Sequence, residues 1–346
     1  MKNHNESVKE QGLNELFEDN KTSASLGSAV KKAKRRTIIR NVLISMAAVV
    51  FVFIIISFLW LFLMRSNEES AMHDMELFSR ITSPNVEQLG VQSMGNGFLE
   101  GILFVDRYKE IGGIPVDWSD QVVTYSLFGG VSRLTGDHSP IQMPDKTDGR
   151  QRSYDRETKQ RIMEFYHPEG EYDFIRNDMK RLNELPEDTL VEMAVSFDRM
   201  YTPDEIRSFI PDTVQLEWYW ADTYTNKESF KKKEVEPGEG EEATLPATPE
   251  LGSELYGFDH FSENPAKSEE IFIETIEEGL SRKDGKYHSE FERIHRHLTN
   301  NSTVLSSENV NVLGVVVSGP ADELAALENL EAIRAAVLGV TADPQL

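Results

Sequence analysis

The sequence predicts a single transmembrane helix followed by a large α+β domain outside the membrane. Residues 42–64 form an apolar run with no charged side chain, and basic residues crowd its N-terminal side. Two strand–helix–strand patterns recur later in the chain. We therefore expect a cytoplasmic tail (1–41), a transmembrane helix (42–64), a membrane-proximal region (65–184) and an α+β domain (185–343).

The apolar run is long enough to cross a bilayer as a helix. At ~1.5 Å per residue it spans roughly 34 Å, and the hydrocarbon core measures about 30 Å. A buried core helix is rarely apolar on every side for this length, and a cleaved signal peptide has a shorter apolar region nearer the start of the chain. We expect a true span, with the ring of Trp60 at the outer headgroups.

Charge predicts the orientation of this span. Six cations precede it, whereas charges of both signs follow it. By the positive-inside rule, the N-terminus is cytoplasmic and residues 65–346 are extracytoplasmic, in a single-pass protein of the cell membrane. The cations also attract the anionic inner leaflet. They are Lys31, Lys32, Lys34, Arg35, Arg36 and Arg40.

Composition argues against several classes of function. The net charge is −23, and because residues 1–41 carry +4, the remainder carries −27, which disfavours direct binding of nucleic acid. The chain has no cysteine, so disulfides and thiol catalysis are excluded. Phosphate-loop, nucleophile-elbow and dinucleotide motifs are missing, and the histidines lack metal-ligand spacing. We expect no enzyme activity, no catalytic residue, no cofactor and no metal.

The tail contains a short amphipathic pattern at helical spacing. Its apolar face consists of Leu13, Leu16 and Phe17, and its acidic neighbours are Glu15, Glu18 and Asp19. Two interpretations are open: a frayed end without a role, or a docking peptide that becomes helical in a partner's groove. Residues 1–41 are too few for a kinase or a folded DNA-binding domain, so we expect their output to be binding.

Residues 189–221 predict a strand–helix–strand unit. The alternation in "TLVEMAVSFD" is typical of a half-buried strand, and Thr202 with Glu205 forms a capping box at the start of a helix. The final segment, "VNVLGVVVSGPADELAALENLEAIRAAVLGVTAD", repeats the order. Two such units favour a split α+β sandwich with helices on one face, for which the ferredoxin-like topology is a candidate.

Two further features lie between the units. Residues 231–250 are acidic and rich in proline and glycine, so we expect a mobile insertion. Trp218 and Trp220 lie on one side of a predicted strand. They either pack beneath the helices or form, with Tyr256 and Phe258, a recognition surface for a partner or ligand.

Several segments together resemble the sigma-factor-regulator family. "KKAKRRTIIRNVLIS" resembles its N-terminal region, and "VSFDRMYTPDEIRSFIPDTVQLEWYWADTY", "YGF" and the final segment quoted above resemble its C-terminal domain. The resemblance implies a membrane-bound anti-sigma factor of Gram-positive bacteria. Such a protein sequesters an extracytoplasmic-function sigma factor at the inner face and releases it on an envelope signal. The resemblance also suggests a second small membrane protein as a partner, and homo-oligomerisation is left open.

The chain departs from the commonest anti-sigma type, which binds zinc through a histidine and two cysteines. Because cysteine is absent, the tail is left as the sigma-binding element, and its apolar face is the expected contact. Two routes to release of the sigma factor are open: a change in assembly state, or proteolysis after Arg65 or within 231–250. The alternative function is a bitopic envelope receptor or structural protein that binds a wall component or a membrane partner. A membrane-tethered hydrolase is a third, weaker possibility.

Overall fold

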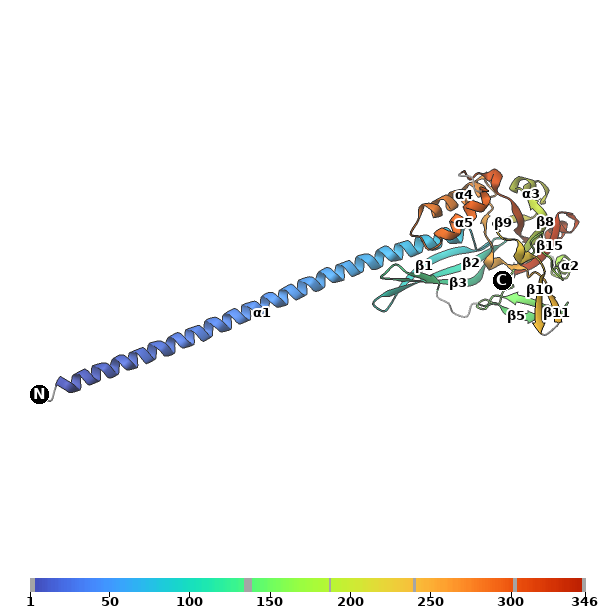
Figure 1. Cartoon of the computed structure of the whole chain (residues 1–346). Coiled ribbons are helices and arrows are strands. Elements are labelled where there is room, and N and C mark those ends of the chain that lie inside the picture. The colour runs from blue at the N-terminus through green and yellow to red at the C-terminus, as the bar shows by residue number, and fades with distance from the viewer. Residues whose placement is uncertain (1–3, 134–138, 187, 239–240, 301–303, 344–346) are drawn as a thin grey trace. The chain divides into compact units, whose positions relative to one another are not determined.

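The computed structural model divides the chain into two compact units, residues 1–63 and 64–346. Each is described by itself (Figure 1). The residues described are 4–133, 139–186, 188–238, 241–300 and 304–343. For residues 4–24, 96, 132–133, 235–238 and 241–243 only the backbone is described.

Helix α1 (His4–Arg80) contains the predicted span and continues beyond it at both ends. No glycine or proline interrupts the sequence from residue 28 to residue 80, and its charged segments are rich in good helix formers. The helix ends shortly before Pro84, whose ring restrains the preceding residue from helical geometry. Residues 4–63 of α1 belong to the first unit, and residues 64–80 belong to the second.

The second unit begins with a four-stranded antiparallel sheet in the order β1-β2-β3-β4. The strands are β1 (Glu87–Asn96), β2 (Glu100–Ile111), β3 (Ile114–Ser126) and β4 (Val131–Arg133). Leu103, Val105 and Val123 bury one face of this sheet against Ala71 and Met75 of α1. The segment of α1 that follows the apolar run is therefore part of a folded core.

Residues 139–182 connect this sheet to the rest of the unit. They form the hairpin β5 (Ile141–Pro144) and β6 (Gln151–Tyr154), strand β7 (Glu164–Phe165) and helix α2 (Met179–Leu182). Strand β7 pairs with β12 (Glu250–Leu251), and Asp178 N donates to Ala336 O at 2.7 Å. The predicted boundary at residue 184 is thus not a break, because the membrane-proximal region and the C-terminal region share one folded unit.

A five-stranded antiparallel sheet forms the centre of the unit, in the order β13-β9-β14-β8-β15. The strands are β8 (Leu190–Tyr201), β9 (Gln215–Ala221), β13 (Gly257–Asp259), β14 (Val312–Pro320) and β15 (Ile333–Ala342). The two predicted strand–helix–strand units are present: α3 (Pro203–Phe209) joins β8 to β9, and α6 (Ala321–Leu324) with a 3-10 turn joins β14 to β15. Their strands interleave, so that β14 lies between β8 and β9.

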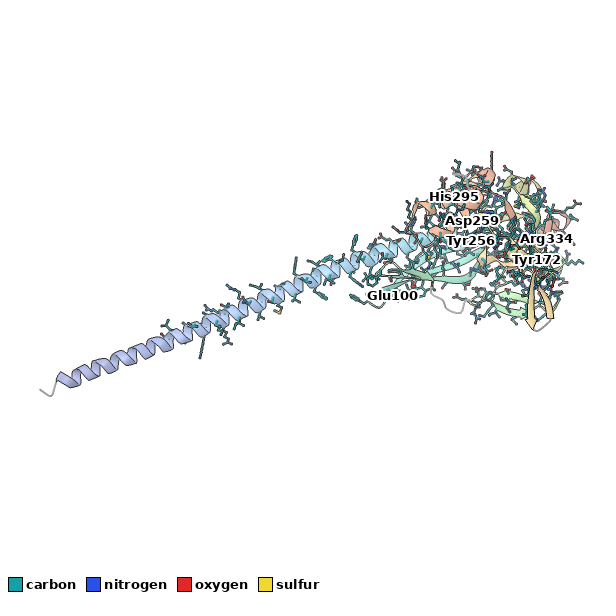
Figure 2. The ribbon with its side chains drawn as sticks, viewed as in Figure 1. Glu100, Tyr172, Tyr256, Asp259, His295 and Arg334 are labelled. Carbon is teal, nitrogen blue, oxygen red and sulfur yellow. The ribbon has the colours of Figure 1, made fainter. Side chains whose placement is uncertain are left out.

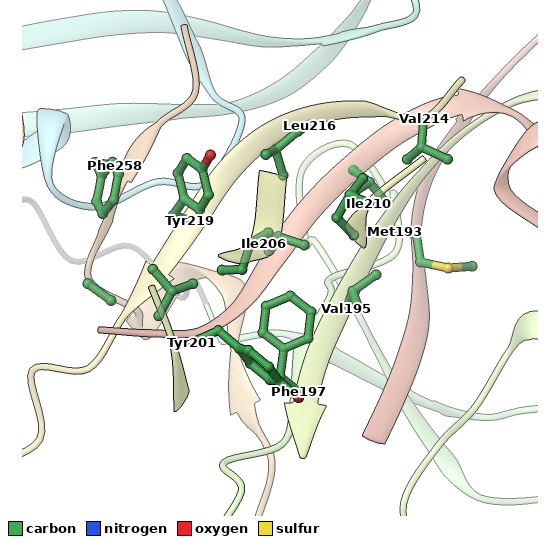
Figure 3. Packing of buried hydrophobic residues seen from close by; sticks show 14 of the residues in the cluster. Met193, Val195, Phe197, Tyr201, Ile206, Ile210, Val214, Leu216, Tyr219 and Phe258 are labelled. Carbon is green, nitrogen blue, oxygen red and sulfur yellow. The ribbon is translucent and has the colours of Figure 1, made fainter. Parts of the chain in front are cut away.

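Helices cover one face of this sheet. Helices α4 (Ala266–Ser281) and α5 (His288–Leu298) pack there with α3, and Thr202 makes both hydrogen bonds of the predicted capping box. Figure 3 shows the core between α3 and the strands, where Phe197, Ile206 and Tyr219 are among the buried side chains. A second, smaller core covers the opposite face.

The predicted mobile insertion at 231–250 contains a pair of strands, and its mobility stays a prediction. Strands β10 (Lys233–Gly238) and β11 (Glu241–Leu245) pair as an antiparallel hairpin. Residues far away in the chain fix its base: Lys232 N donates to the Glu171 carboxylate at 3.1 Å, and Ala247 N donates to Glu171 O at 3.1 Å. These long-range bonds hold the base of a segment whose composition alone is typical of disorder.

Candidate partner-binding segment and helix α1 junction

The predicted partner-binding residues of the tail lie within helix α1. The backbone of residues 4–24 is helical, which supports the spacing argument that Leu13, Leu16 and Phe17 share a face. The positions of their side chains, and of those of Glu15 and Glu18, lie outside what the structure describes. Their role in binding stays a prediction.

The first unit presents two contrasting surfaces along one helix. The six predicted topology cations, from Lys31 to Arg40, are all exposed. The apolar run beyond them is exposed too, with Phe53, Phe58 and Phe62 each about 70% accessible, and α1 is long and apolar enough to cross a membrane. Apolar surface on this scale is unfavourable in water, so the segment needs a lipid or protein environment.

In the second unit, the end of α1 is clamped to the turn between α4 and α5. Asp74, which is only 6% exposed, accepts hydrogen bonds from Arg282 Nε at 3.0 Å and Nη2 at 2.8 Å. The second carboxylate oxygen of Asp74 accepts from Lys286 N at 2.9 Å. Both oxygens are therefore satisfied by one short turn, and Gly285 leaves room for that approach because a Cβ there would lie 3.0 Å from Asp74 Oδ1.

Aromatic and apolar contacts reinforce this junction. Phe78 stacks on Tyr287 with ring centroids 3.9 Å apart, and Leu77 and Ile81 are buried in the main core. Tyr256 meets Phe78 edge to face. The end of α1, together with Ile81 that follows it, thus contacts the α4–α5 turn and the main core.

A buried ion pair links the two large sheets. Lys109 Nζ of β2 lies 2.7 Å and 2.9 Å from the carboxylate oxygens of Glu192 in β8, and both side chains are almost wholly buried. Asn85 and Val340 N complete the coordination of Glu192. Burial lowers the pKa of Lys109, opposed by the Glu192 carboxylate. Sequence reasoning missed this pair, although a glutamate inside the buried strand "LVEMAVSF" indicates that a partner is required.

A network of arginines and carboxylates fixes the β5–β6 hairpin. Arg152, 1% exposed, donates to both oxygens of Asp178 at 2.8 and 2.7 Å, and Arg181 donates to Asp145 at 2.6 Å. The Arg181 hydrogen bond holds the pKa of Asp145 well below its usual range. Because each of these carboxylates is paired with an arginine, the network is suited to cross-linking segments rather than to proton transfer.

The structure corrects the recognition surface predicted around the tryptophans. Trp218 and Trp220 are fully buried, and so is Phe258 at 2% exposure, so none of them can form an open binding face. The tryptophans also do not pack beneath the helices. They face the smaller core, against Phe165 and Tyr166 and neighbouring apolar residues, while Tyr219 and Phe258 face the helices.

Tyr256 is the one partly exposed member of that predicted set, and it is engaged within the fold. The Tyr256 hydroxyl donates to Glu290 at 3.1 Å, and the Arg293 guanidinium lies over the Tyr256 ring. Figure 2 labels Tyr256. Packing requires the glycine at the centre of the "YGF" motif. A Cβ on Gly257 would lie 1.9 Å from Tyr219 O and 2.4 Å from the Trp218 ring, so only glycine fits between these strands.

The described residues contain no group of three histidine and acidic side chains placed to hold a metal ion. The two histidines have different partners. His297 Nε2 lies 3.6 Å from Asp222 Oδ1, and His288 Nδ1 lies 3.4 Å from Gly279 O. Burial raises the pKa of Glu217 and of Glu250 to about 7, and Glu217 accepts a hydrogen bond from the hydroxyl of the buried Ser318. The absence of enzyme activity stays a prediction.

Comparison with known proteins identifies two family models in this chain. The model described as sigma factor regulator N-terminal matches residues 28–116, and the model described as sigma factor regulator C-terminal matches residues 182–340. Together they include the basic cluster, the apolar run, the first sheet as far as β3, and the central sheet. No curated protein and no solved structure matches the chain.

Proposed function

The chain belongs to the sigma factor regulator family, and on this basis we propose that it is a membrane-bound anti-sigma factor. In this proposal residues 1–41 sequester an extracytoplasmic-function sigma factor at the inner face of the membrane. Residues 65–346 lie outside and sense an envelope signal. The observation that carries the proposal is the run of six exposed cations directly before an exposed apolar helix, which favours a cytoplasmic N-terminus.

The tail has the chemistry that binding to a sigma factor requires. Leu13, Leu16 and Phe17 offer an apolar stripe to a groove, and Glu15 and Glu18 add negative charge that complements a basic, DNA-binding surface. Tethering to the membrane raises the effective concentration of the tail near a bound partner. Repression would then be occlusion of the surface that polymerase or promoter DNA needs.

The signal would reach the tail through α1. One helix contains the tail, the span and the residues clamped by Arg282 and Tyr287, so a change at the α4–α5 turn acts on a continuous element. This favours a conformational or assembly change over proteolysis. Arg65 lies inside α1, and most of 231–250 is paired or hydrogen-bonded, whereas proteases prefer exposed loops.

We also infer a ferredoxin-like topology for the C-terminal region. Two strand–helix–strand units interleave in the order β15-β8-β14-β9, with every neighbouring pair antiparallel, as in a split βαβ sandwich. Strand β13 and helices α4 and α5 are additions between the two units. Those additions provide the turn that contacts α1, so the signalling junction is built on what this chain adds to the simpler topology.

The proposal is tested by alanine substitution of the apolar face in the full-length protein. The triple variant Leu13→Ala, Leu16→Ala, Phe17→Ala should release the sigma factor and raise transcription of a sigma-dependent reporter to the level seen without the regulator. The sigma factor itself is identified as a protein that co-purifies with the unaltered chain and is lost from the triple variant.

A matched control lies on the opposite side of the same helix by helical spacing. The variant Gln11→Ala, Thr22→Ala should repress as the unaltered chain does, with both variants present in the membrane at equal amounts. Persistent repression by the triple variant would show that the tail is not the contact. A bitopic receptor or structural protein, the alternative function, would leave transcription unchanged in every variant.

A further inference from the structure

Two β-turns of the first sheet carry large apolar side chains into solvent at the same end of that sheet. Phe98 and Leu99 lie between β1 and β2 and are 68% and 47% exposed, and Phe128 lies between β3 and β4 and is 85% exposed. Leu127 N donates to Leu99 O at 2.8 Å, so the two turns are joined. Gly97 and Gly129, both with positive φ, allow the tight turns that place these side chains outermost.

These turns are attached to the residue of α1 that follows the apolar run. Asn67 Nδ2 donates to Ser126 O and to Leu127 O, both at 2.9 Å. Asn67 is three residues beyond Met64, which corresponds to ~4.5 Å along a helix. The headgroup layer on each side of a bilayer is about 5–7 Å thick, so Asn67 and the turns bonded to it fall at headgroup depth when residues 42–64 cross the membrane.

Charged side chains are scarce at the end of the sheet that carries these turns. Residues 91–99 and 121–132 contain no charged side chain, in a chain in which 27% of residues are charged. The acidic and basic residues of β2 and β3 gather towards the opposite end, from Asp106 to Asp120, with Glu100 as an exception. An exposed apolar surface next to a membrane segment, with Glu100 as the one carboxylate of β2 beside it, is the pattern expected of an interfacial contact.

We propose that the apolar turn tips Phe98, Leu99 and Phe128 insert into the outer headgroup layer of the lipid bilayer beside the chain's own helix. The inference rests on the proposed function, because it takes residues 42–64 as a membrane span. Its consequence is that the first sheet is fixed against the membrane at the tips and against α1 along its buried face. The first sheet and the end of α1 would then be held together at the membrane surface.

The test uses the full-length chain, whose lack of cysteine makes Phe128→Cys the only thiol. A nitroxide attached there is examined in vesicles of phosphatidylethanolamine and phosphatidylglycerol, with oxygen or a water-soluble nickel chelate on both sides of the membrane. The matched control is Asp117→Cys, exposed on the same sheet and nine residues from Ser126, roughly 30 Å away along β3. The Phe128→Cys label should relax faster with oxygen and slower with nickel than the control label.

Other outcomes overturn the inference. Equal access of nickel to both labels would place the tips in water. Dipolar broadening that disappears on dilution with unlabelled chain would show that the tips contact a second copy of the chain. Protection of the label from nickel only in native membranes would show that the tips contact a partner protein. Extraction of the membranes at alkaline pH distinguishes the two proposals. A chain that is extracted refutes the membrane span and with it the proposed function. A chain that resists extraction while its label stays in water refutes only the insertion of the tips. A Leu99→Cys label should repeat the result.

Discussion

Asp74 and Arg282, 208 positions apart in the chain, are joined by two hydrogen bonds of 3.0 and 2.8 Å that fasten the end of helix α1 to the α4–α5 turn. This pair lies between the element that would cross the membrane and the domain that would sense a signal. Because Asp74 is buried and its other oxygen accepts Lys286 N, loss of either partner leaves unsatisfied polar groups at the junction.

Substitution of Arg282 by alanine should therefore destabilise the second unit. We expect the free energy of unfolding of the full-length protein in detergent to fall by about 1–3 kcal/mol, the usual effect of leaving a buried polar atom without its hydrogen-bond partner, because Lys286 N still bonds the other oxygen of Asp74. Urea unfolding followed by tryptophan fluorescence measures it. Glu76→Gln breaks the exposed Glu76–Arg80 pair on the same helix and should change it by less than about 1 kcal/mol. Equal effects of the two variants would contradict the assignment.

The Lys109–Glu192 pair should show strong coupling in a double-mutant cycle. Lys109→Met alone leaves a buried carboxylate without its cation and should destabilise the protein by about 3–5 kcal/mol. Adding Glu192→Gln removes the charge, and the amide oxygen can still accept from Asn85, so the double variant should recover most of the loss. Additive losses in urea unfolding would show that the two side chains do not depend on each other.

The two tryptophans of β9 should behave as core residues. Trp220→Ala should cost about 3–5 kcal/mol of unfolding free energy, whereas Phe128→Ala, at an exposed tip, should change it by about 0.5 kcal/mol or less. Trp220→Phe removes the indole N–H of Trp220 and with it the 3.2 Å hydrogen bond to the Tyr224 hydroxyl. Trp218 Nε1 has no hydrogen-bond partner among the described residues. Trp218→Phe should hence be the milder change. A ligand-binding role for the tryptophans would instead predict altered binding with unaltered stability.

The contribution of Glu250 to stability should fall as the pH rises from about 5 to about 7. Burial, with a smaller contribution from Glu254, raises the pKa of Glu250 from 4.5 to about 7, so the folded protein binds this proton more tightly than the unfolded chain. Ionisation at neutral pH then favours unfolding, by roughly 1–2 kcal/mol after allowance for partial exposure.

Glu250→Gln tests this pH dependence, because the amide keeps the shape of the side chain and removes its charge. The variant should lose the Glu250 part of the slope, and its melting temperature should exceed that of the unaltered protein at pH 8 but not at pH 4. Glu263→Gln, at an exposed glutamate, is the control and should leave the slope unchanged. Parallel melting curves for Glu250→Gln and the unaltered protein across this range would refute the assignment.

Local patterns predicted much of the fold correctly. The capping box at Thr202 and the two strand–helix–strand units depend on spacing within a few residues, and the structure confirms them. The faces of the central strand could not be assigned in the same way. Alternation shows that Trp218 and Trp220 share a side, but both sides of β9 are buried, so alternation does not indicate which side meets the helices.

The amino-acid sequence by itself determined the helix that contains the apolar run, the cations before it and the family, because each is encoded in contiguous residues. Tertiary structure alone decided which charges are paired and which segments pair as strands. Asp74 meets Arg282, Lys109 meets Glu192, and residues 233–238 pair with residues 241–245 above a base fixed by Glu171. Those contacts join positions far apart in the chain, and their strength comes from burial, which exists only once the strands and helices have packed.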